Sequence, residues 1–176
     1  MRVRHMALCA LFAALLAISA WISIPAGAVV FTLQTFTVAL SLWLLGGKLG
    51  CLSIGLYLLL GIVGLPVFSS FQGGVGVLLN ATGGYIIGFL VWGLLYWLLT
   101  AISPDSQKLQ ILAMVLGLIA CYSFGTGWFN HLYVRQGGSG SLGIVILQCV
   151  VPYLLPDAIK LSLAFLLHRR LKRFVY

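Results

Sequence analysis

Long apolar runs separated by short polar or glycine-rich breaks dominate the chain. A helix needs about 20 apolar residues to cross a bilayer core, so apolar runs of roughly that size are candidate crossings. There are six, covering approximately residues 6–24, 29–45, 49–68, 75–100, 109–133 and 156–175. The alternation of apolar and polar positions typical of a membrane β-barrel is missing, and only helices otherwise satisfy the backbone in lipid. The pattern predicts an all-α polytopic membrane protein with six transmembrane helices.

One apolar stretch, residues 142–155, is too short to cross alone and stops before Pro156. It is interpreted as a lid or a re-entrant segment. Pro156 then suits the first position of the last helix, where a missing N–H costs nothing. Asp157 would follow in the first turn, where the helix dipole favours a negative charge.

The cations give the expected orientation, because lysine and arginine gather on the cytoplasmic side of membrane proteins. Six crossings place both termini on one side, and eight of the ten cations fall there. These eight are Arg2, Arg4, Lys48, Lys108, Arg169, Arg170, Lys172 and Arg173. Arg135 lies opposite, and Lys160 lies inside the last crossing. Both termini are therefore expected in the cytoplasm, in a multi-pass protein of the cell (plasma or inner) membrane.

Composition agrees with this picture. The chain is 62% hydrophobic and 7% charged, whereas soluble domains average about 45–50% and 25%. The net charge of +8 could suggest nucleic acid, but the cations lie at membrane boundaries, so lipid is the expected partner and nucleic acid is not. A cleaved signal peptide ending near residues 26–28 is disfavoured, because the first run exceeds the ~7–15 residues of a secretory core. No repeat or soluble segment is visible, so residues 1–176 are expected to form a single membrane-embedded domain.

Asp157 and Lys160 are the strongest candidates for chemistry. Each costs about 2.5–3.5 kcal/mol at the centre of a membrane helix, so an interaction must offset the cost. Their spacing of three places them on one helix face. A paired acceptor and donor would complement a buried ligand with an N–H beside a C=O, such as a urea or an amide. The alternative is a structural ion pair that holds helices together.

Two further segments could line the same cavity. Residues 71–85 are rich in glycine, which lets the backbone approach a ligand closely, and Gly83, Gly84, Asn80 and Tyr85 are the candidates there. This segment lacks the ending of a Walker motif, so nucleotide binding is not expected, and ordinary turns are the alternative. Thr32 and Gln34 open the second crossing, although such side chains often bond helix carbonyls instead.

The remaining motifs concern partners, metals and catalysis. Alanines repeat along the first helix at spacings of three and four, making a groove for another helix, either in the same bundle or in a partner. The four cysteines lack CxxC spacing and are expected to be small core residues. The three histidines are scattered, so no metal site is expected, and two acids with no nucleophile elbow do not suggest an enzyme. With no ATP-binding motif, energy is expected from a partner.

Five motifs, taken together and in order, resemble the BioY family, the biotin-binding S components of energy-coupling-factor (ECF) vitamin transporters. They are IPAGAVVFTLQTFT at 24–37, LLGGKLG at 44–50, GLPVF at 64–68, TGGYIIGF at 82–89 and PDAIK at 156–160. The resemblance implies a six-helix protein that captures biotin from outside, in a cavity closed by outer loops. It also implies association with a transmembrane coupling subunit and two ATPase subunits, with biotin as substrate and no cofactor.

The resemblance also assigns residues. It matches Asp157 and Lys160, together with Gly83, Gly84 and Tyr85, to the family's binding residues. It matches Ala10 and Ala14 to the motif that docks on the coupling subunit. Four alternatives remain at this stage: an S component for another vitamin, a solitary biotin transporter without an ATPase module, a membrane enzyme using Asp157 as acid or base, and a passive channel.

Overall fold

The computed structural model describes residues 3–25, 29–135 and 142–175, and within them the chain is almost entirely helical. The long helices are α1 (Val3–Trp21), α2 (Gln34–Ile62), α4 (Gly83–Thr100), α5 (Gln107–Arg135) and α7 (Val151–Val175). Shorter elements are β1 (Ser23–Pro25), β2 (Val30–Thr32), a 3-10 turn (Ser69–Phe71), α3 (Val75–Leu79) and α6 (Leu142–Cys149). Arg2 and the cleavage position considered at 26–28 lie outside the described residues. The all-helical prediction is confirmed.

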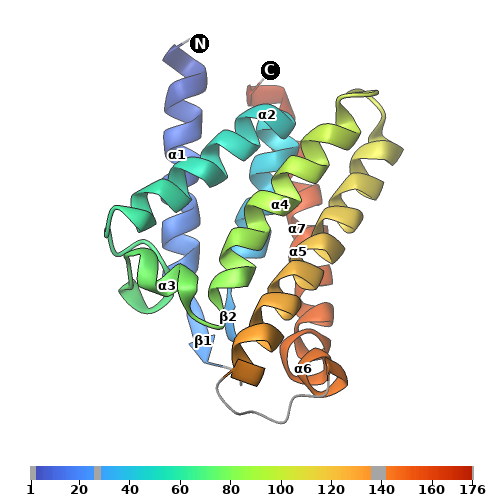
Figure 1. The fold of residues 1–176 in the computed structure, drawn as a ribbon. Coiled ribbons are helices and arrows are strands. Elements are labelled where there is room, and N and C mark those ends of the chain that lie inside the picture. The colour runs from blue at the N-terminus through green and yellow to red at the C-terminus, as the bar shows by residue number, and fades with distance from the viewer. Residues whose placement is uncertain (1–2, 26–28, 136–141, 176) are drawn as a thin grey trace.

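Five of the described helices are long and apolar enough to cross a membrane. Helix α2 covers both the second and the third predicted segments, and its two halves meet at Gly46, whose φ of 77° and ψ of 169° are not helical. Glycine adopts this backbone without the steric cost of a side chain. Figure 1 shows the first half of α2 rising from β2 and the second half turning back toward α3. The kink therefore turns one element into two antiparallel legs.

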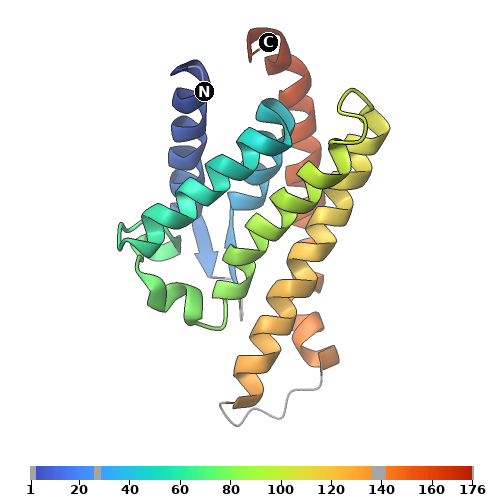
Figure 2. The ribbon, with the colours of Figure 1, turned by 45° about the horizontal axis from the view of Figure 1, so that its top comes forward.

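The two ends of the bundle differ in content. Both termini, the kink of α2 and the α4–α5 connection lie at one end, which we call the terminal end (Figures 1 and 2). The β-strands, α3 and α6 lie at the opposite end, called here the hairpin end. Consecutive long legs thus run alternately between the two ends.

The short β-hairpin is a feature that the sequence prediction missed. Strands β1 and β2 pair antiparallel, with Ser23 opposite Thr32 and Pro25 opposite Val30. Pro25 removes a backbone donor and disfavours a continuing helix. Pairing the two extended segments satisfies backbone groups that two separate helix ends would leave open.

The predicted start of the last helix is wrong. Helix α7 begins at Val151, so Pro156 lies inside it and Asp157 is not in its first turn. Pro152 already occupies the opening turn, where a missing N–H is tolerated, and Pro156 then removes only one further hydrogen bond. The dipole argument for Asp157 therefore fails, and its charge must be stabilised by side chains. The stretch 142–155 consists of α6 followed by the beginning of α7.

The core lies among α1, α2, α4 and α5, with part of α7 packed against it. Its largest fully buried side chains include Trp92, Tyr57 and Leu16. A Cβ on Gly117 of α5 would lie 2.0 Å from Cδ1 of Trp92, so this glycine allows α4 and α5 to pack closely. The four cysteines are buried and free, as expected for small core residues. Large apolar side chains such as Leu98 and Leu155 are more than two-thirds exposed, as lipid-facing residues would be.

Candidate functional site

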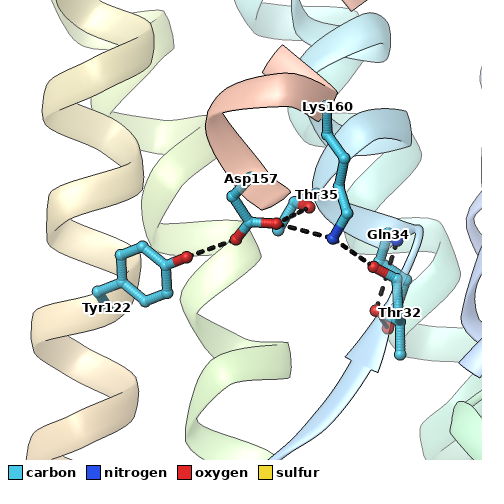
Figure 3. A network of polar contacts seen from close by, with 6 residues as sticks. All are labelled: Thr32, Gln34, Thr35, Tyr122, Asp157 and Lys160. Carbon is cyan, nitrogen blue, oxygen red and sulfur yellow. Dashed lines mark hydrogen bonds and ion pairs between the residues drawn. The ribbon is translucent and has the colours of Figure 1, made fainter. Parts of the chain in front are cut away.

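Asp157 and Lys160 of α7 form an ion pair near the hairpin end of the bundle. Nζ of Lys160 lies 2.7 Å from Oδ1 of Asp157, which confirms that the spacing of three brings the two groups together. Both residues are buried, with exposed fractions of 3% for Asp157 and 6% for Lys160. Figure 3 shows the pair at the centre of a polar network contributed by four elements. A pair this deeply buried needs further hydrogen bonds to offset desolvation.

The carboxylate of Asp157 obtains these bonds from two other helices. The hydroxyl of Thr35, on α2, donates to Oδ1 at 2.8 Å. The phenol of Tyr122, on α5, donates to Oδ2. These two bonds join α2 and α5 to α7 through one carboxylate.

The ammonium of Lys160 has partners of its own besides Asp157. Nζ donates to the backbone carbonyl of Thr32 at 2.7 Å and lies 3.8 Å from the centroid of the Phe31 ring. A cation over an aromatic face is attracted by the ring quadrupole, more strongly when it is shielded from water. Lys160 therefore also anchors strand β2 against α7.

The pair retains capacity for a ligand. A carboxylate offers about four lone-pair positions, and the bonds from Lys160, Thr35 and Tyr122 occupy three of them. An ammonium has three donors, and the bonds to Asp157 and Thr32 use two. Counting the described residues alone, one acceptor position and one donor thus remain in adjacent groups.

A cavity of about 60 Å³ adjoins the pair and could use this capacity. Its walls include Asp157, Lys160, Thr32 and Tyr85, together with residues at 29–30, 35, 89, 118, 121–122, 149 and 153. The volume accommodates a few water molecules, at about 10–15 Å³ each on this measure. The pair is therefore not enclosed solely by its own partners, and a larger ligand would have to enlarge the space.

The other predicted site residues lie at different depths around the cavity. Tyr85 lines it, and its hydroxyl is 3.0 Å from Oγ1 of Thr126. Gln34 is buried one step behind the wall, where its amide donates to the Tyr57 hydroxyl at 2.8 Å and accepts from the Thr32 hydroxyl at 3.1 Å. It supports the position of Thr32 and does not line the cavity.

Gly83, Gly84 and Asn80 lie behind the residues that form the cavity wall. Gly83 and Gly84 open α4, and a Cβ on Gly84 would lie 2.4 Å from the Trp128 side chain. They allow α4 to approach its neighbours closely, and neither lines the cavity. Asn80 is exposed, and its carbonyl accepts from Nε1 of Trp128 at 3.1 Å.

Two tyrosines at the cavity were not selected from the sequence. Tyr122 bonds Asp157, and Tyr153 donates through its hydroxyl to the carbonyl of Val29, so both tie cavity walls together. The sequence does contain a sign of their role, because each phenol lies inside an apolar segment and a buried phenol needs a hydrogen-bond partner.

The alanines of α1 separate into two sets. Ala13, Ala17 and Ala20 are buried in the bundle, whereas Ala10 and Ala14 are exposed on the outer face. The buried alanines therefore pack inside the bundle. The exposed alanines form a surface of small residues on the outer face of α1.

The fold and this site define a class: a helical protein with several membrane-spanning segments and a buried ion pair beside a cavity. The BioY family model matches residues 1–176, and the chain belongs to the BioY family. It is 40% identical over 171 residues to a protein named biotin transporter BioY from Thermotoga maritima, covering 97% of each chain. It is 37% identical over 172 residues to a probable biotin transporter BioY from Pyrococcus horikoshii, covering 98% of each.

A solved structure agrees with these relatives. The fold matches the S-component for biotin from an ECF-type ABC transporter with a TM-score of 0.83 and 26% sequence identity, covering 98% of this chain and 92% of that one. The family resemblance predicted from the motifs is confirmed. These relatives are named as transporters, so the expectation of a transport protein rather than an enzyme is confirmed as well.

Proposed function

We propose that this chain is a biotin-binding S component that captures biotin from the outer side of the cell membrane. The names of the relatives support the substrate. The observation that carries the proposal is the buried Asp157–Lys160 pair, which has one unused acceptor position and one unused donor beside a cavity.

The ureido ring of biotin fits this capacity, because it has two N–H donors and one carbonyl. Asp157 accepts a hydrogen bond from one N–H, and Lys160 donates to the carbonyl. Tyr85 and Thr32 enclose the rings, while Gln34, Gly83, Gly84 and Asn80 hold the surrounding backbone in place. In a site without water, such charge-assisted bonds discriminate strongly against ligands that cannot form them.

The cavity must expand to admit biotin, and Tyr122 is the wall that can yield. Besides the cavity, Tyr122 lines a largely apolar groove of about 410 Å³ between α5, α6 and the start of α7. Rotation of its ring toward that groove enlarges the cavity and frees a second lone pair on Asp157.

We further propose six membrane crossings, with residues 1–176 as one membrane-embedded domain. The kink at Gly46 supports this count, because it divides α2 into two legs that run in opposite directions. Lys48 follows the kink of α2 at Gly46, and Lys108 lies in the first turn of α5, so both are near the terminal end, which supports a cytoplasmic position for that end.

Energy coupling comes from partner subunits. We propose that Ala10 and Ala14 dock on a helix of an ECF transmembrane coupling subunit, which associates with ATPase subunits. Their exposure on α1 supports this role, since small residues let helix backbones approach in lipid.

The test is direct binding by the purified protein. We expect biotin to be carried through purification and detected by mass spectrometry, and to bind in preference to other vitamins in calorimetry. Asp157→Asn and Lys160→Ala should each weaken biotin binding at least tenfold, because a charge-assisted bond contributes about 1.5–3 kcal/mol. Lys108→Gln, which changes an exposed cation at the terminal end, is the matched control and should bind normally.

The outcomes separate the alternatives. Another vitamin that binds better than biotin would identify an S component of different specificity. Biotin uptake by liposomes containing only this chain would favour the solitary transporter. Unchanged biotin affinity in both site variants would contradict the proposed site.

A further inference from the structure

A second polar cavity lies at the terminal end, on the same helices that carry the first. Its volume is about 250 Å³, and its walls include Trp43, Gly46, Gly47, Asp105, His168 and Lys172. The side chains of His168 and Lys172 follow Lys160 along α7 at intervals of eight and twelve residues. The biotin site and this cavity share no lining residue.

Two polar atoms in residues of this cavity's walls are buried and have no hydrogen-bond partner among the described residues. They are Nε1 of Trp43 and Nδ1 of His168, in side chains that are each 7% exposed. Buried polar groups without a hydrogen bond are rare, and each costs free energy that a ligand can recover. The two rings lie near each other, with centroids 6.4 Å apart. Neither atom is exposed to a water-sized probe, so a ligand in the cavity reaches them only when the two rings turn toward it.

The chemistry of these atoms restricts the ligand. The indole N–H of Trp43 can only donate, and Nδ1 of His168 donates in the tautomer that carries its proton there. The ammonium of Lys172 adds further donors and a positive charge. Together they form a set of donors suited to an oxyanion.

Asp105 requires a hydrogen-bond donor on the ligand, in contrast to the donors described above. Asp105 also lines the cavity, and an ionised carboxylate can only accept hydrogen bonds. A simple anion would meet repulsion there, whereas a phosphate ester with a free hydroxyl would donate that hydroxyl to Asp105. The position also fits, since basic pockets between helices at the cytoplasmic side of membrane proteins bind anionic lipid headgroups.

We propose that this cavity binds a glycerol phosphate group, either as the headgroup of phosphatidylglycerol or as the free ester. The phosphate accepts from Trp43, His168 and Lys172, and the glycerol hydroxyls donate to Asp105. This site is separate from the biotin site, and the inference from its position rests on the proposed cytoplasmic side of the terminal end.

The test measures binding of two probes to delipidated protein in detergent. Short-chain phosphatidylglycerol and glycerol 1-phosphate are titrated separately, with phosphatidylcholine of equal chain length as the reference lipid. Native mass spectrometry counts the bound molecules, and the melting temperature reports stabilisation. We expect phosphatidylglycerol to bind at least tenfold more tightly than phosphatidylcholine.

Variants locate the binding. Trp43→Phe removes the indole N–H and Lys172→Gln removes the charge, and each should weaken phosphatidylglycerol binding about tenfold. The matched controls are Trp97→Phe and Lys108→Gln, which change an exposed tryptophan and an exposed lysine outside the cavity walls. Melting without ligand verifies that each variant folds. Lys172 is exposed, so its variant keeps the test decisive if Trp43→Phe does not fold.

The two probes identify the source of the group. Binding of both supports the site and shows that the ester alone suffices, whereas binding of phosphatidylglycerol alone supports the site with lipid as its source. Equal binding of phosphatidylcholine overturns the proposal, as does full binding by Lys172→Gln. An equal loss in Lys108→Gln also overturns it, because it would indicate diffuse attraction to a basic surface.

Discussion

Removal of Lys160 alone tests whether the site pair is held together as the structure indicates. In Lys160→Met the carboxylate of Asp157, a residue that is 3% exposed in the structure, stays buried and keeps the hydrogen bonds from Thr35 and Tyr122 alone among the described residues. Breaking a buried ion pair from one side costs about 3–5 kcal/mol, because an uncompensated charge remains. For a chain of this size, that corresponds to a fall in melting temperature of about 6–20 °C. The converse variant, Asp157→Asn, strands the ammonium and should fall into the same range.

The double variant Asp157→Asn/Lys160→Met distinguishes this mechanism from a simple loss of contacts. It has no buried charge in the site, and replacing a whole buried pair by neutral groups is often close to neutral. We expect it to be more stable than either single variant, with a coupling of at least about 2 kcal/mol.

The assay is thermal unfolding in detergent, followed by intrinsic fluorescence, with biotin binding measured on the same samples. All three variants should lose biotin affinity. The double variant should therefore be more stable than the single variants without binding biotin any better. Single variants that cost less than about 1 kcal/mol would resemble an exposed surface pair and contradict the argument. A double variant that lost as much stability as the two single variants together would also contradict the argument.

Three further predictions concern other parts of the chain. Tyr122→Phe keeps the aromatic cavity wall but removes the hydrogen bond to Asp157 that must break when the ring rotates, so calorimetry should show biotin binding about two- to tenfold tighter; weaker binding would contradict the proposed rotation. Gly46→Ala should destabilise the protein by about 1–3 kcal/mol because of the positive φ, although no atom lies within 4 Å of an added Cβ. Gly55→Ala, in a helix interior with the same free space, should be neutral or stabilising in the same melting experiment. Ala14→Leu should leave the melting temperature unchanged and abolish co-purification with a coupling subunit, whereas Ala13→Leu should lower the melting temperature, since Ala13 is 1% exposed.

The sequence predicted those features that depend on local composition and spacing. Apolar runs located the long helices, and the break between residues 45 and 49 coincides with the kink at Gly46. The interval between Asp157 and Lys160 predicted their contact, because three residues along a helix bring side chains to one face.

Features that depend on packing between distant segments could not be predicted in this way. Thr35 and Tyr122 reach Asp157 across 122 and 35 residues, and their contacts exist only because α2 and α5 pack beside α7. The start of α7 was placed five residues too late, because the preference of proline for a first turn fitted Pro152 as well as Pro156. Local preference allows the helix to start at either proline. In the folded chain, where α6 packs against α7, the helix starts at the earlier one.

The arrangement of the two cavities also argues against a passive channel. Along α4 the cavity near the hairpin end reaches Phe89 and the cavity at the terminal end begins at Tyr96, with Trp92 between them. Along α7 the corresponding residue between Lys160 and His168 is Ala164. Trp92 and Ala164 are fully buried, and a Cβ at Gly117 of α5 would already touch Trp92, so in the described part of the chain this layer is close-packed. Close-packed interiors do not open by small displacements, and movement of a solute through this layer requires helices to separate. Passage of a ligand from one cavity to the other therefore requires this layer to be rearranged.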